Sequence, residues 1–160
     1  MKKPLLLTLA LVVLSAGGVA VSFGARDDAN DKSGSGYGSA AAKAHPAEAK
    51  AVLAAANDFW DAMMAMQATG TATFSEDLHL GSCRLLNAER ALADTQEAEQ
   101  AAQLAHWQRM EDIYRKIKAL FDTGTKGGEP DKLAAARYYR AEAELWLVEA
   151  GGTVPGDRLK

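Results

Sequence analysis

The sequence contains few of the residues that build specialised sites. Cys83 is the only cysteine among 160 residues, so no disulfide can form within the chain. Basic residues are not in excess, because the formal net charge is −3, and this excludes a dedicated nucleic-acid binder. With 48% hydrophobic residues the chain is too apolar for wholesale disorder, and its length is too small for a polytopic transporter. These limits leave one modest domain held together by packing.

The longest uncharged stretch lies near the amino terminus. Lys2 and Lys3 precede it, and residues 5–14 are nearly all leucine, valine and alanine. Small residues follow and offer cleavage sites, a pattern typical of an export signal. Its 22 uncharged residues would also form a helix of about 33 Å, enough to cross a bilayer. We therefore predict a signal peptide or a single N-terminal membrane anchor at 1–25, in a protein that is periplasmic or anchored in the inner membrane facing the periplasm.

Composition divides the rest of the chain into three parts. Residues 26–44 are rich in glycine, serine and aspartate and predict a flexible linker. Residues 45–151 are dominated by alanine, leucine, glutamate, glutamine, arginine and lysine, the strongest helix formers, and no segment alternates as a strand would. We therefore predict an all-α domain over 45–151 and a flexible tail over 152–160.

The prolines and glycines of this domain, which begin or end helices, predict three helices, over 46–68, 76–122 and 130–150. Pro46 and Pro130 suit the first helical position, and glycines follow each predicted end. Apolar residues recur at helical spacing on the first helix and form a strict heptad seam on the last one. The first face is Val52, Ala55, Phe59, Met63 and Met66, and the heptad seam is Ala134, Tyr138, Ala141, Leu145 and Val148.

The segment 76–122 contains no proline and only one glycine, so it predicts a single central helix about 70 Å long. The two shorter helices together match its length, and short connections would make each antiparallel to one half of it. The result is an elongated antiparallel helical hairpin, a coiled coil of three helices, which covers only one side of the central helix. It therefore predicts a protein partner or a homo-oligomer. In the alternative, the central helix breaks near its Ala/Gln/Glu-rich middle and the chain folds into a compact bundle.

Two stretches carry a resemblance to a known family. Residues 84–93 read RLLNAERALA and residues 136–147 read ARYYRAEAELWL. Over 82–150 the chain resembles the periplasmic helical hairpins of the TolC family of outer-membrane efflux components. The resemblance implies a cell-envelope location and helical contacts with neighbouring subunits. The chain lacks the alternating strand segments of a membrane barrel, so the resemblance implies an isolated relative of the hairpin and not a channel.

Motifs for chemistry are missing. We find no nucleophile with a base at a recognisable spacing, no phosphate-binding loop and no cofactor fingerprint, so we expect a protein that is not an enzyme and has no cofactor. His79 and Cys83 are four residues apart and would share a helical face. Two ligands are too few for a metal centre, so none is predicted there.

Two hypotheses of function follow. The first is an exported, non-enzymatic helical protein of the cell envelope that acts through protein–protein contacts or self-association, with Tyr139 and Trp146 as an interaction surface if they face outward. The second is a periplasmic metal- or stress-binding helical protein that uses soft ligands. Its candidate ligands are Met63, Met66, His106 and Met110, and the plainer interpretation of these methionines is flexible core filler.

Overall fold

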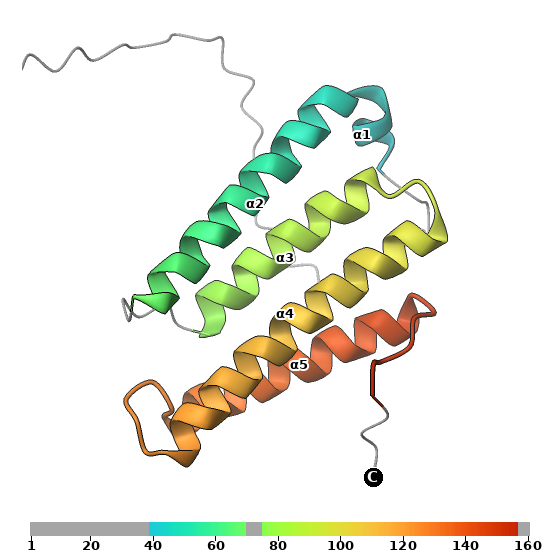
Figure 1. Ribbon diagram of the computed structural model, residues 1–160. Helices are drawn as coiled ribbons and strands as arrows, with labels where there is room; N and C mark the ends of the chain where they lie inside the picture. Colours follow the sequence, from blue (N-terminus) through green and yellow to red (C-terminus); the bar gives the residue numbers. More distant parts are fainter. Residues whose placement is uncertain (1–38, 70–74, 157–160) are drawn as a thin grey trace, which may run out of the picture. The chain divides into compact units, whose positions relative to one another are not determined.

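The structure is a computed structural model that describes residues 39–69 and 75–156, and within these residues the regular elements are all α-helices (Figure 1). The predicted all-α class is therefore confirmed for this part of the chain. The predicted signal or anchor at 1–25 and the first part of the predicted linker lie outside the described residues. The helices are α1 (Ala40–Ala44), α2 (Pro46–Ala68), α3 (Ser75–Leu92), α4 (Gln96–Asp122) and α5 (Pro130–Glu149).

The prediction of one central helix over 76–122 is wrong, because the chain leaves helical geometry between α3 and α4. Thr95 is extended, with φ −133° and ψ 163°, and its side-chain oxygen accepts a hydrogen bond from the backbone N–H of Ala98 at 3.1 Å. This is an N-cap, and acidic residues in the first turn of α4 add a favourable charge at the positive end of the helix. Arg90 at the end of α3 reaches across the turn to Glu99, at 2.8 Å.

The break reverses the chain and changes how the helices pack. Helix α2 contacts α3, α3 contacts α4, and α5 contacts both α4 and α3. Figure 1 shows α2, α3 and α4 side by side, with α5 against α4. The break at 93–95 lies just before the Ala/Gln/Glu-rich segment where the alternative arrangement placed it. The three-helix hairpin around one spine is thus replaced by a succession of antiparallel helices.

Helices α4 and α5 supply most of the buried core cluster. Met110, Ile113 and Ile117 of α4 are buried at helical spacing. From α2 only Met63 is buried, whereas Val52 and Met66 of the predicted face are exposed. The buried core cluster contains Met63, Leu78, Trp107, Met110, Ile113, Ile117, Leu133, Ala136, Ala143 and Leu147.

The heptad seam predicted for the last helix does not face the core. All five of its residues are exposed, and α5 buries a different face made of Leu133, Ala136, Ala143 and Leu147. The sequence contains two apolar stripes on this helix, and the buried one also carries Arg140. In the structure Arg140 forms an ion pair with the buried carboxylate of Glu111 in α4, which compensates the charge on the inner face.

The ends of the helical domain differ from the predicted boundaries. Residues 40–44 of the predicted linker form α1, because the Ser39 side chain accepts a hydrogen bond from the Ala42 N–H at 3.0 Å and caps a short helix. At the other end, Val154 of the predicted tail packs against the core. Among the described helices, none combines the length and apolar character that crossing a membrane requires.

We expect Thr95→Ala to lower the free energy of unfolding by about 1 kcal/mol, because the first turn of α4 loses its cap. Thr95→Ser keeps an acceptor oxygen and should stay close to the parent protein. Thr153→Ala, at an exposed position, is the matched control. Urea unfolding followed by circular dichroism measures the difference, and equal midpoints for Thr95→Ala and Thr153→Ala would contradict the assigned cap.

Candidate metal centre

A buried polar network joins α3 to α4 beside the core. Ser82 and His106 are fully buried, and the Ser82 Oγ lies 2.7 Å from the His106 Nδ1. Arg109 donates from Nε to the same Ser82 oxygen at 2.8 Å, and its guanidinium forms an ion pair with Glu89 at 3.2 Å. The network therefore fixes the position of the His106 ring through partners on both helices.

Three potential metal ligands meet next to this network. One ligand atom from each of His79, Cys83 and His106 lies within 4.8 Å of the other two. The closest pair is His79 Nε2 and Cys83 Sγ, at 3.5 Å. Glu142 of α5 adds a carboxylate oxygen 3.6 Å from the same His79 nitrogen. Two helices thus supply an imidazole–thiol–imidazole set, and a third helix places a carboxylate at its edge.

Two aromatic rings of α5 cover the histidines. Tyr139 stacks on His79, with ring centroids 4.1 Å apart and an interplanar angle of 8°. Trp146 stacks on His106, with centroids 5.5 Å apart and an angle of 20°. The sequence hypothesis required Tyr139 and Trp146 to face outward as an interaction surface. In the structure both residues are half-buried and each ring stacks on a histidine, so the ring face toward that histidine is already in contact.

Burial keeps both histidines in the neutral form that binds metals. Desolvation lowers the pKa of His106 to about 3, with smaller contributions from the positive charge of Arg109 and from His79, while Ser82 acts in the opposite direction. Desolvation also lowers the pKa of His79, although Glu142 and Glu76 partly oppose it. The Nε2 of His106 is buried and has no hydrogen-bond partner among the described residues. When the neutral ring donates a hydrogen bond from Nδ1 to Ser82, its Nε2 carries no proton and has a lone pair that can bind a metal ion.

Nucleophilic catalysis does not fit the same residues. The Ser82 hydroxyl and His106 are within hydrogen-bond distance, as in a nucleophile–base pair, but both are fully buried and out of reach of a substrate. A base whose pKa lies near 3 also cannot take a proton efficiently at neutral pH. Burial raises the pKa of the Cys83 thiol to about 11, so it is not an activated nucleophile either.

The methionine set of the second hypothesis is only partly brought together. Met63 and Met110 belong to the buried core cluster. Met66, however, is exposed on α2, outside that cluster. Sequence reasoning found the His79–Cys83 pair from its four-residue spacing and missed that His106 joins it. Only a break between α3 and α4 brings α4 back alongside α3, so the missing signal was the capping potential of Thr95.

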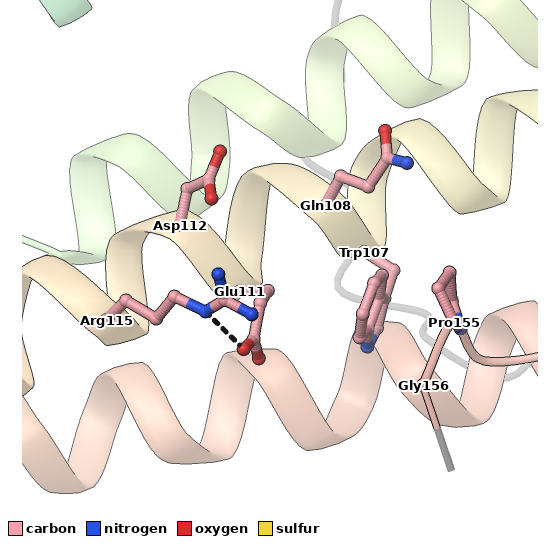
Figure 2. Close-up of a pocket in the computed structure, with 7 residues that line it drawn as sticks. All are labelled: Trp107, Gln108, Glu111, Asp112, Arg115, Pro155 and Gly156. Atoms are coloured by element: carbon pink, nitrogen blue, oxygen red, sulfur yellow. Dashed lines mark hydrogen bonds and ion pairs between the residues drawn. The ribbon is translucent and has the colours of Figure 1, made fainter. Parts of the chain in front are cut away.

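An open groove on the other side of α4 is a weaker candidate site. It has a volume of about 510 Å³. Figure 2 shows that its polar side chains do not converge, because Gln108 and Asp112 extend away from the side of α4 that carries Trp107 and Glu111. Glu111 is already held by Arg115 and Arg140. The groove is lined by Trp107, Gln108, Glu111, Asp112, Arg115, Pro155 and Gly156.

Acid is expected to destabilise the fold between about pH 6.5 and pH 3. An unfolded histidine titrates near 6.5 and His106 near 3 in the folded chain, so below pH 6.5 the unfolded state binds a proton that the folded state does not. Stability is present above pH 6.5 and falls with acid by up to about 1.4 kcal/mol per pH unit for this group. Thermal unfolding across this range measures the slope. His106→Asn should flatten it, whereas His45→Asn, at an exposed histidine, should not; an unchanged slope in His106→Asn would refute the assignment.

Comparisons with protein-family models, with curated proteins and with solved structures give no match. The resemblance of residues 82–150 to TolC-family hairpins therefore stays a prediction.

Proposed function

We propose that this helical domain binds a transition metal ion of the zinc or cuprous class through His79, Cys83 and His106. The observation that supports the proposal is the convergence of the three ligand atoms to within 4.8 Å of one another. Imidazole and thiolate are the donors that zinc and cuprous ions prefer among protein side chains. The role we propose is binding and not turnover, in line with the absence of a catalytic motif in the sequence.

The spacing of the closest pair suits such an ion. A tetrahedral zinc ion with bonds of about 2.3 Å to sulfur and about 2.0 Å to nitrogen separates these two donors by roughly 3.5 Å. The distance between His79 Nε2 and Cys83 Sγ is 3.5 Å. The other ligand distances, which are at most 4.8 Å, would have to shorten when an ion binds. Glu142, whose carboxylate oxygen lies 3.6 Å from the same His79 nitrogen, lies where it can become a fourth donor.

The surroundings of the ligands also favour a binding site. A ligating histidine is usually oriented by a hydrogen bond at its other nitrogen, and Ser82 occupies that place at Nδ1 of His106. Arg109 holds Ser82 in turn. The stacked rings of Tyr139 and Trp146 restrict rotation of the two imidazoles and exclude water from one side of each. Ligands held in this way lose less conformational freedom when an ion binds.

The proposal includes a location in the cell envelope. The export signal expected at 1–25 would deliver the domain to the cell envelope, where it would act as a non-enzymatic metal-binding protein. Mass spectrometry of the protein recovered from an envelope fraction of a bacterial host tests this part. A mature chain that begins after the apolar run would support it, and a full-length chain confined to the cytoplasm would contradict it.

Titration of the purified full chain with Co²⁺, a spectroscopic substitute for zinc, should produce a thiolate charge-transfer absorption with one-to-one stoichiometry. Cys83→Ser should abolish the band, and His79→Asn or His106→Asn should weaken binding more than tenfold, because each removes a ligand. Zinc at a hundred times its Kd should then raise the free energy of unfolding by about 2.7 kcal/mol. Parallel titrations with zinc and with cuprous ion, followed by calorimetry, identify the preferred metal.

The controls separate this centre from the methionine set. His45→Asn removes an exposed histidine, and Met66→Leu with Met110→Leu removes two soft thioethers, so neither change should affect the Co²⁺ affinity. Ser82→Ala should weaken binding by roughly tenfold, because His106 loses its orienting partner. No binding in the parent protein, or equal affinity in the parent and His106→Asn, would overturn the proposal.

A further inference from the structure

Helix α5 carries a second apolar face that points away from the core. Tyr138, Leu145 and Val148 are 60%, 56% and 55% exposed, and they belong to the heptad seam that the sequence analysis identified. Ala134 and Ala141 complete the seam and are exposed as well. No described helix covers this face, since α3 and α4 pack on the opposite one. A continuous stripe of this kind on a helix is typical of an interaction surface.

The spacing of the stripe specifies the kind of partner. Its residues follow one another at steps of 4, 3, 4 and 3, which keep an apolar seam facing one partner helix in a left-handed coiled coil. In heptad terms Tyr138 and Leu145 are a positions, and Ala134, Ala141 and Val148 are d positions. The face therefore fits another amphipathic helix with the same repeat, and α5 of a second copy has it.

Charges beside the seam select one orientation. Arg137 and Glu144 occupy successive g positions, and Glu142 and Glu149 occupy e positions. In an antiparallel pair g positions face g positions, so Arg137 of each copy meets Glu144 of the other, giving two opposite-charge pairs. In a parallel pair g faces e, so Arg137 would meet Glu142 with opposite charge but Glu144 would meet Glu149 with like charge, and the two contacts would offset each other. Arg137 is exposed and forms no ion pair with the described residues, so it is available for this contact.

Side-chain sizes agree with the same register. When Arg137 lies opposite Glu144, Tyr138 faces Ala141 of the second copy and Leu145 faces Ala134. Each large apolar residue is then placed against a small one, the arrangement that fills the space between two helices without voids. The contact is also isologous, because each copy uses the same surface, and it closes as a dimer with two-fold symmetry.

We propose that two copies of this chain associate through the outer face of α5, paired antiparallel, with reciprocal contacts between Arg137 and Glu144. The interface is separate from His79, Cys83 and His106, so it stands independently of the metal-binding proposal.

Light scattering and sedimentation of the purified full chain over a wide concentration range test the assembly. The parent protein should pass from monomer to dimer as its concentration rises, and Leu145→Glu should weaken the dimer by more than tenfold because it places a charge in the seam. Gln108→Glu, at an exposed position on α4, adds the same single negative charge as Leu145→Glu and is the matched control, which should leave the dimer unchanged. Circular dichroism verifies that each variant keeps its helix content. A parent that stays monomeric at every concentration, or a dimer that survives Leu145→Glu, overturns the proposal.

Charge exchange tests the partner and its orientation. Arg137→Glu and Glu144→Arg should each weaken the homodimer, by roughly tenfold, since two opposite-charge pairs become like-charge pairs. Mixing the two single variants should restore a dimer, and so should the double variant Arg137→Glu, Glu144→Arg. In a parallel dimer Glu144→Arg would instead strengthen association. That result, or failure of the mixture to restore a dimer, refutes antiparallel pairing of this face.

Discussion

The reversal of the chain at residues 93–95 is the constraint on which the rest of the structure depends. A straight helix over 76–122 would separate His79 from His106 by about 40 Å along its axis. Because α3 ends at Leu92 and Thr95 caps the next helix, α4 runs back along α3, and the two histidine rings come to 6.2 Å between centroids. The polar network and the candidate metal centre both exist because of this turn.

The network between α3 and α4 shows how a polar group can be buried in a small helical domain. A buried guanidinium is costly unless it is neutralised and hydrogen-bonded, and Arg109 satisfies both needs through Glu89 and Ser82. The result specifies which face of α4 meets α3, something that methionine and alanine packing defines poorly because these side chains fit many arrangements. Arg140 and Glu111 play the corresponding part between α4 and α5.

Much of the local structure could be predicted from the sequence, and the failures have identifiable physical causes. The bounds of α2 and α5 follow from Pro46 and Pro130 at first helical positions and from nearby glycines, whose effects are local. The break could not be predicted from glycine and proline alone, since Asp94 and Thr95 are tolerated within helices and become a boundary when a tertiary contact such as that between Arg90 and Glu99 favours it. The inner face of α5 was missed because the partner of Arg140 lies on another helix. For the same reason the pair of His79 and Cys83 was visible in the sequence, whereas the contribution of His106 was not.

Gly81 affects how easily α3 can change its local conformation. It lies between His79 and Cys83, the two proposed ligands of that helix, and a Cβ at this position would be 2.8 Å from the Met63 sulfur of α2, so a larger residue would force the Met63 side chain to shift. A glycine within a helix also weakens it by about 1 kcal/mol relative to alanine, through its greater backbone freedom. The turn that carries His79 and Cys83 therefore contains the residue of α3 with the lowest helix preference. If a metal ion binds as proposed and draws its ligands together, α3 would adjust at this turn, and Ile113 and Ile117 of α4 would keep their packing.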